Sequence, residues 1–366
     1  MVLAPMADVT DAAFRRIIAK YGKPDVMFTE FVSADGLCST GRKKLLVNLM
    51  YSESERPIVA QLFTGKPEKM REAAKLAKEL GFDGVDINMG CPDKKVEKQC
   101  AGASLIKNPK LARELIRAAK EGAEGLPVSV KTRLGYNKDE LETWLPELLA
   151  EEPAAIIIHA RTRKEMSLVP ARWERVKRAV EIRESFFSSP SAPTPPARGG
   201  VSSLRDGVVG EKGEKRALGA SQDLERSVCG ESERCTASVR RGLGGGRSKT
   251  LILGNGDALD VPDARKKIAE TGADGVMLGR AIFGNPWLFS QHPMLTKEER
   301  LPVMVEHTKL FDELLGKHKN FAIMKKHYKA YVNGFPEAKE LRVKLMETNS
   351  AEEVEAVISD FLAGRK

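Results

Sequence analysis

Long hydrophobic runs are missing from this chain of 366 residues. No apolar stretch approaches the roughly 18 consecutive residues that a membrane-spanning helix needs, so the sequence predicts a protein that does not enter a membrane. A secretory signal is also missing, because no charged segment, apolar stretch and cleavage site follow one another at the start. We therefore expect a soluble protein of the cytoplasm.

Paired cysteines are missing as well, and we expect reduced thiols and no bound metal. No G-x-G-x-x-G loop follows the first expected strand, which excludes a Rossmann pocket for a firmly held dinucleotide. The five cysteines are odd in number and form no C-x-x-C pair, which excludes a zinc ribbon and a thioredoxin-type motif: Cys38, Cys91, Cys100, Cys229 and Cys235.

Apolar residues, by contrast, make up 42% of the chain, which is enough for a buried core. The formal net charge of +9 favours a polyanionic partner, because phosphates attract lysine and arginine without any base-specific contact. Many basic proteins bind no nucleic acid, so the position of the charge matters more than its sum.

Eight short apolar segments alternate with amphipathic helical patterns such as 69–80, 109–123 and 260–271. Gly81 and Gly272 follow two of these patterns, where helices commonly end. Eight strand–helix repeats favour a closed (β/α)8 barrel, or TIM barrel, of the α/β class over an open sheet. The expected strands are 2–4, 26–29, 57–61, 84–88, 128–131, 155–159, 251–254 and 275–279.

Two segments depart from this alternation. Residues 186–248 are rich in Ser, Pro, Gly and Arg without lasting periodicity, and such a composition buries too little apolar surface to offset chain entropy. We expect a disordered insertion there, between the sixth helix and the seventh strand of a barrel that spans 1–290. Residues 291–366 show only helical periodicity, which predicts a small all-α domain.

This helical segment is locally basic. Between Lys317 and Lys344 there are eight Lys or Arg residues and two Glu residues. Such a face suits the binding of nucleic-acid phosphates, but a basic helix face that only contacts solvent is an equally good interpretation.

Polar residues end nearly every expected strand. In a barrel of this kind the residues at the carboxyl ends of the strands form the active site, whereas a purely structural barrel would carry apolar or turn residues there. The sequence therefore predicts a site at this rim, formed by Met6, Glu30, Gln61, Asn88, Lys131, His159, Asn255 and Arg280.

Three of the rim features have a definite chemistry. Cys91 follows a buried strand between Gly90 and Pro92, where a thiol can reach a substrate, although most free cysteines are simply small buried residues. Lys131 suits a flavin, since a cation near the pyrimidine side of the ring stabilises its reduced form, and Gln61 can bond the ring edge. The turns at 254–257 and 279–280 suit a ligand phosphate.

Taken together and in order, these motifs resemble the tRNA-dihydrouridine synthases. The resemblance runs over nearly the whole chain outside 186–248 and extends to Gly334-Phe335-Pro336 in the helical segment. It rests on Ala4-Pro5-Met6-Ala7-Asp8, Thr29-Glu30-Phe31, Asn88-Met89-Gly90-Cys91-Pro92, Val130-Lys131-Thr132-Arg133, His159-Ala160-Arg161, Gly254-Asn255-Gly256-Asp257, Gly279-Arg280-Ala281 and Gly284-Asn285-Pro286-Trp287.

The resemblance implies an FMN-binding barrel, a helical domain that helps to bind tRNA, and NADPH or NADH as a transient reductant. It assigns to Cys91 the role of general acid, which protonates C5 of a flipped-out uridine after hydride transfer from FMN to C6. Asn88 and Arg133 are candidates for contacts with the uridine. By position, the FMN-binding residues are Pro5, Met6, Ala7, Gln61, Lys131, His159, Asn255, Gly256, Asp257, Gly279 and Arg280.

We expect a monomer. Two alternatives to this function remain open. One is another FMN-dependent barrel that reduces or oxidises a free pyrimidine or other small metabolite, for which the basic helices would be unnecessary. The other is a catalytically impaired relative that only binds RNA. The presence of Cys91, Lys131 and the Asn255-Gly256-Asp257 turn argues against the second alternative.

Overall fold

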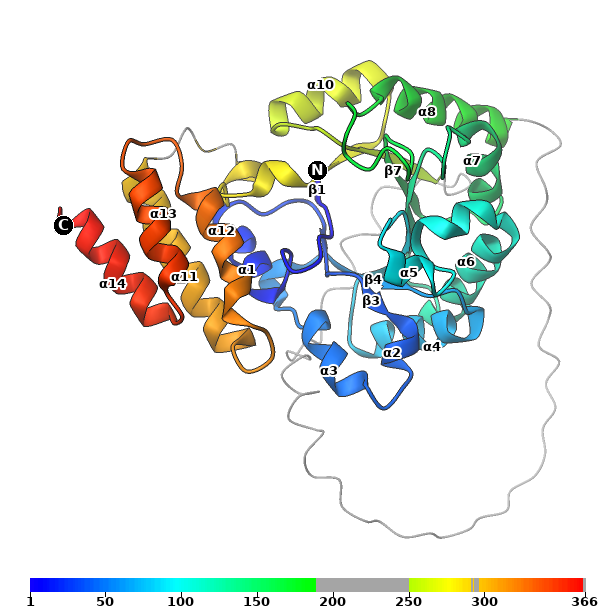
Figure 1. Ribbon diagram of the computed structural model, residues 1–366. Helices are drawn as coiled ribbons and strands as arrows, with labels where there is room; N and C mark the ends of the chain where they lie inside the picture. The colour runs from blue at the N-terminus through cyan, green and yellow to red at the C-terminus, as the bar shows by residue number, and fades with distance from the viewer. Residues whose placement is uncertain (189–249, 291, 293–295, 365–366) are drawn as a thin grey trace, which may run out of the picture.

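The computed structural model describes residues 1–188, 250–290, 292 and 296–364. Within these residues eight parallel strands pair in the order β1-β9-β8-β7-β6-β5-β4-β2, and a bridge between Val2 and Val26 joins β1 to the segment of β2 and closes the sheet. Figure 1 shows the helices arranged around these strands. The predicted (β/α)8 barrel is confirmed. Its strands are β1 (Val2–Leu3), β2 (Met27–Phe28), β4 (Ile58–Phe63), β5 (Gly84–Met89), β6 (Val128–Arg133), β7 (Ala155–His159), β8 (Leu251–Asn255) and β9 (Gly275–Leu278).

A short additional strand, β3 (Val32–Ser33), pairs with the end of β4 and was not predicted. Only Glu30 and Phe31 separate it from the predicted strand 26–29, and Val32 and Ser33 form no separate apolar run of strand length. The strand follows Glu30 in the sequence and leads directly into α2 (Ala34–Leu37).

The barrel helices begin and end where the local sequence favours it. Asn108 caps α6 by accepting a hydrogen bond from the Leu111 amide at 3.2 Å, and Pro109 occupies the first helical position. Gly272 ends α10 in the left-handed conformation, with φ of 70°. Besides α2, the helices are α1 (Ala12–Tyr21), α3 (Arg42–Leu46), α4 (Pro67–Glu79), α5 (Lys94–Glu97), α6 (Pro109–Ala123), α7 (Leu141–Leu149), α8 (Trp173–Ser188) and α10 (Val261–Thr271).

Helix α8 corrects one predicted boundary. It continues through Ser188, and Phe186 and Phe187 pack against the barrel core, so residues 186–188 do not belong to an insertion. Two adjacent aromatic residues supply this apolar contact. The rest of the predicted insertion lies outside the described residues.

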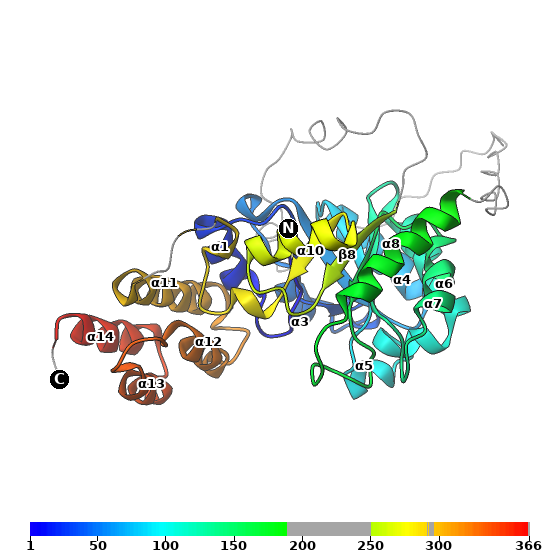
Figure 2. The same ribbon diagram turned by 90° about the horizontal axis from the view of Figure 1, so that it is seen from above.

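Four helices follow the barrel and pack beside it (Figure 2). Their apolar residues form a core of their own, to which Ala13 and Ile17 of α1 also belong. An ion pair between Lys319 and Glu30, with 2.6 Å between Nζ and Oε2, joins the helical region to the barrel rim. The predicted helical region is confirmed, as α11 (Lys297–Leu315), α12 (Met324–Tyr331), α13 (Ala338–Glu347) and α14 (Ala351–Leu362).

The longest of these helices does not resemble a transmembrane segment. Helix α11 carries charged residues along its whole length, from Lys297 to Glu313. Across the residues with described positions, no helix combines the length and the apolar character needed to cross a bilayer.

A buried ion pair fixes α1 against the connection that leads into β4. Arg15 Nε lies 2.7 Å from Glu55 Oε2, and both side chains are fully buried. Arg15 also donates to the Thr10 carbonyl at 2.6 Å and to the Met50 carbonyl. One guanidinium thus ties three chain segments together beside the first strand of the barrel.

Replacing Arg15 by methionine should lower the free energy of unfolding by about 3–5 kcal/mol, because the buried Glu55 would lose its close partner and keep only the more distant Arg16, at 3.7 Å. Urea denaturation followed by circular dichroism measures this loss. Lys20→Met is the matched control, since its ion pair with Glu306 is exposed and should contribute only about 0–1 kcal/mol. Equal losses in the two variants would contradict the structural role of Arg15.

Candidate active site

A cavity of about 660 Å³ opens at the carboxyl ends of the barrel strands. Residues of β1, β4, β5, β6, β7, β8 and β9, or of the loops that directly follow them, contribute to its wall. Of the site residues predicted from the sequence, Glu30 and Ala7 do not line it. Glu30 instead accepts from the Asp8 amide and pairs with Lys319, and Ala7 lies on the exposed side of the turn after β1. The predicted residues in the wall are Pro5, Met6, Gln61, Asn88, Cys91, Lys131, Arg133, His159, Asn255, Gly256, Asp257, Gly279 and Arg280.

Lys131 and Asn255 form the floor on one side. Lys131 Nζ donates to Asn255 Oδ1 at 3.1 Å, and Asn255 Nδ2 donates to the Met277 carbonyl at 2.8 Å. Burial and the nearby Arg133 guanidinium lower the pKa of Lys131 to about 8. Because an ammonium group has three donors and Asn255 takes one, the remaining donors suit an acceptor or an anion in the cavity.

The loop that carries Cys91 is held by hydrogen bonds from its main chain to Asn88 and to Ala103. Asn88 Oδ1 accepts from the amides of Gly90 and Cys91 at 3.1 and 2.9 Å. The Cys91 carbonyl accepts from the Ala103 amide at 2.9 Å. Gly102 permits this approach, because it has φ of 63° and a Cβ there would lie 2.7 Å from the Cys91 carbonyl oxygen.

The Cys91 thiol itself is half-buried in the cavity wall. Burial is the main reason that its pKa is raised above the ordinary value. At neutral pH the group is therefore a neutral thiol with a proton to give, rather than a thiolate nucleophile.

His159 is surrounded by cations and is neutral. Burial, followed by Lys131, Arg133, Arg161 and Arg280, lowers its pKa far below the ordinary value. Arg161 Nη1 lies 3.1 Å from His159 Nε2. A guanidinium can only donate, so Nε2 accepts and the ring proton is on Nδ1.

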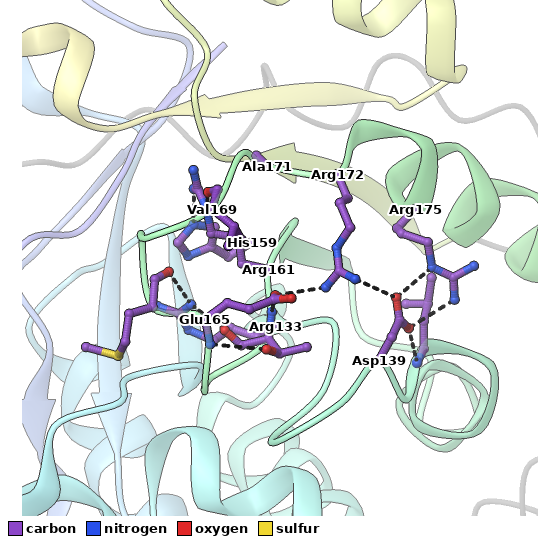
Figure 3. A network of polar contacts seen from close by, with 12 residues as sticks. Arg133, Asp139, His159, Arg161, Glu165, Val169, Ala171, Arg172 and Arg175 are labelled. Carbon is purple, nitrogen blue, oxygen red and sulfur yellow. Dashed lines mark hydrogen bonds and ion pairs between the residues drawn. The ribbon is translucent and has the colours of Figure 1, made fainter.

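The loop between β7 and α8 is fixed by a network of arginine contacts, which Figure 3 shows from close by. Arg133 reaches two loops at once: Nε donates to the Gly90 carbonyl at 2.7 Å, and Nη1 donates to the carbonyls of Thr162 and Met166 at 3.1 Å each. On the outer side of the loop Arg172 pairs with Glu165 at 2.8 Å (Figure 3). Arg133 thus couples the Cys91 loop to the loop after β7.

Asp257 occupies the turn after β8 and connects two arginines. It pairs with Arg161 and with Arg280, the latter at 2.7 Å, and it accepts from the Ala171 amide at 2.8 Å. Its neighbour Gly256 has φ of 122°, and a Cβ there would lie 2.9 Å from Ala171 Cβ. Only glycine fits this close turn. The Arg280 side chain remains 65% exposed beside it.

Comparison with known proteins identifies the family. The sequence model described as "Dihydrouridine synthase (Dus)" matches residues 2–186 and 246–364. The chain belongs to the dihydrouridine synthase family. It is 37% identical over 364 residues to "Probable tRNA-dihydrouridine synthase 2" of Bacillus subtilis (strain 168), covering 98% of this chain and 93% of that protein. It is 35% identical over 366 residues to "Probable tRNA-dihydrouridine synthase" of Staphylococcus aureus (strain COL), covering 99% and 93%.

Several cavity residues of this dihydrouridine synthase family member were not predicted from the sequence. Arg161 is the most important of them, because it orients His159 and pairs with Asp257. Its position two residues after His159, at the end of an expected strand, could have predicted that it lies at the cavity. The other residues have no chemical signature of their own, and they are Ala4, Phe31, Gly90, Pro92, Ser167, Ala258, Leu259, Met277 and Ala281.

The raised pKa of Cys91 predicts a shifted pH dependence for its alkylation. Iodoacetamide reacts with the thiolate, so the rate at Cys91 should stay low at neutral pH and rise only above the pH at which N-acetylcysteine reaches half of its maximal rate. Mass spectrometry of the peptide that contains Cys91 separates this thiol from the others. A midpoint below that of the reference thiol would show that Cys91 is a thiolate-forming nucleophile instead of an acid.

Proposed function

We propose that this protein reduces uridines of tRNA to 5,6-dihydrouridine. The names of the relatives from B. subtilis and S. aureus support the reaction, since both are named "Probable tRNA-dihydrouridine synthase". The observation that carries the proposal is that a protonated thiol, Cys91, shares one cavity with the cationic Lys131. Reduction of a carbon–carbon double bond needs a hydride and a proton, and this cavity offers a donor for the proton.

FMN is the cofactor that these residues fit. The polar groups of Lys131 and Gln61 suit the edge of the flavin ring, and Pro5 and Met6 offer an apolar surface beside it. The phosphate fits beside Gly256, Gly279 and Arg280. Asn255, Asp257 and His159 line the same part of the cavity, and Asp257 pairs with Arg280. When bound, FMN supplies the hydride for C6 of the uracil ring.

The Lys131 ammonium has two donors left for the flavin, and the cations near it make the cavity suitable for a ring that becomes anionic. A cofactor that carries a phosphate also matches the exposed Arg280 guanidinium. NADPH, or NADH, serves as a transient reductant. The chain has no Rossmann loop to hold it firmly, which suits a reductant that leaves before tRNA binds.

Cys91 acts as the general acid in this scheme. Its thiol proton goes to C5 of the uracil ring, so one hydride and one proton saturate the bond between C5 and C6. Asn88 and Arg133 flank the thiol and have the hydrogen-bonding groups to contact the base edge. The uridine must leave the tRNA stack to reach a cavity of this depth.

The basic helical region is the proposed surface for tRNA. On α12, Lys326 and Lys329 are exposed, and Lys326 lies within electrostatic reach of Asp8, Asp11 and Glu30 at the barrel mouth. Phosphates bound there would lie beside the cavity entrance. We propose a monomer that works in the cytoplasm, where tRNA is available, with residues 1–290 as the catalytic domain and 291–366 as the tRNA-binding domain.

Cys91→Ala should leave flavin bound and slow uridine reduction by about 10²-fold or more, as expected for the loss of a general acid. Dihydrouridine formed in unmodified tRNA measures the rate, and the visible absorption of the purified protein reports the flavin. Cys38→Ala is the control, since this thiol is bonded to the Lys69 carbonyl on another part of the barrel. Turnover of Cys91→Ala at the parent rate would rule out Cys91 as the acid.

The double variant Lys326→Glu/Lys329→Glu should weaken tRNA binding by about tenfold or more and flatten its salt dependence, because two phosphate contacts are replaced by repulsion. Filter binding at several salt concentrations measures both effects. Lys177→Glu, on the exposed side of α8, should change neither. Equal weakening by the control would show that overall charge, and not this surface, attracts the tRNA.

A further inference from the structure

A buried carboxylate beneath the cavity has no role in the mechanism proposed above. Asp86 is fully buried in β5 and does not line the cavity. The strand register places it between Gln61 of β4 and Ser129 of β6. Gln61 Nε2 donates to Asp86 Oδ2 at 2.7 Å, and the Ser129 hydroxyl donates to Asp86 Oδ1.

This carboxylate is the start of a directed chain of hydrogen bonds. An ionised carboxylate can only accept, so the Gln61 amide must turn its NH2 group toward Asp86 and its oxygen away. That oxygen, Oε1, accepts from Asn88 Nδ2 at 3.1 Å. Asn88 must then turn its own oxygen toward the amides of Gly90 and Cys91. These amides donate hydrogen bonds to Asn88 Oδ1 at 3.1 and 2.9 Å.

Each link in this chain fixes the orientation of the next. A side-chain amide can otherwise turn by half a rotation and exchange its donor and acceptor ends at little steric cost. If Gln61 turned, its NH2 group would face the NH2 group of Asn88, and the turn of Asn88 would remove the acceptor from the Cys91 amide. The position of the thiol therefore depends on an acceptor two side chains away.

We propose that Asp86 is a positioning residue that sets the orientation of Gln61 and Asn88 and thereby holds the Cys91 loop in the cavity wall. The proposal rests on the proposed function only in so far as Cys91 is the proton donor. The carboxylate touches neither substrate nor cofactor in this account. Its part is to fix the direction of the hydrogen bonds that run from Gln61 through Asn88 to the amides of Gly90 and Cys91.

Two substitutions at this position separate the hydrogen-bond chain from charge. Asp86→Leu is similar in size and removes the acceptor, so Gln61 loses the group that orients it. Asp86→Asn can keep the chain of hydrogen bonds, because its amide oxygen can accept from Gln61. Its NH2 group can donate to the Ser129 hydroxyl, since a hydroxyl can act as an acceptor as well as a donor. If only the direction of the hydrogen bonds matters, Asp86→Leu should loosen the Cys91 loop, and Asp86→Asn should leave the loop as it is in the parent.

Hydrogen exchange of the flavin-free protein provides a measurement that does not depend on activity. In Asp86→Leu the amides of Gly90 and Cys91 should exchange about tenfold faster than in the parent, as expected when a hydrogen-bonded loop opens more often. In Asp86→Asn they should exchange at about the parent rate. Peptides from β7 serve as an internal reference, and Gln61→Leu breaks the same chain one link later if Asp86→Leu does not fold.

Uridine reduction by the flavin-loaded enzyme is the second readout. Asp86→Leu should lower kcat by about tenfold with little change in KM for tRNA, since the acid is displaced and the tRNA surface is untouched. Ser129→Ala is the matched control, because it removes the other partner of Asp86 and leaves the link to Gln61 intact. It should match the parent in exchange and in kcat.

Two results would overturn the proposal. One is parent-like exchange at Gly90 and Cys91 in both Asp86→Leu and Gln61→Leu. The other is equally fast exchange in Asp86→Asn and Asp86→Leu, which would assign the effect to the buried charge and not to the direction of the bonds. If the parent enzyme does not reduce tRNA uridine at all, the proposed function fails, while the exchange experiment still decides the role of Asp86.

Discussion

Closure of the parallel sheet is the constraint on which the site depends. Because all strands run in one direction, their carboxyl ends meet at one rim, and the register of neighbouring strands decides which side chains lie side by side. Asn88 is in register with Lys131, and His159 with both Arg133 and Asn255. Residues as far apart in the chain as Asn88 and Asn255 thus share one wall because of backbone pairing.

Charge balance is the second determinant of the cavity. Lys131, Arg133, Arg161 and Arg280 all act on His159, which remains neutral and is oriented by one of them. Asp257 partly offsets these cations, and it uses both of its oxygens on protein partners. The cavity keeps an excess of donors, which suits an electron-rich ring and a phosphate. The same contacts hold the loops after β7 and β8 against each other, so binding and loop order depend on one network.

The sequence predicted the barrel and most of the cavity for identifiable reasons. Apolar runs at strand length gave all eight barrel strands, and polar residues at their ends gave Gln61, Lys131, His159 and Asn255. Arg161 and the chain from Asp86 escaped prediction because their importance comes from partners that only register brings near. β3 was missed because it lies only two residues beyond the predicted strand 26–29 and has no apolar run of its own. The last turn of α8 was missed because three residues do not show a helical period.

The most direct test of the central claim is the oxidation of the reduced flavin by RNA in the absence of oxygen. The flavin-loaded protein is reduced with NADPH and mixed with unmodified tRNA, with free uridine, or with tRNA that already contains dihydrouridine. Unmodified tRNA alone should restore the absorption of oxidised flavin, with one dihydrouridine formed for each flavin oxidised. Oxidation by free uridine but not by tRNA, or a protein that binds tRNA and no flavin, would contradict it.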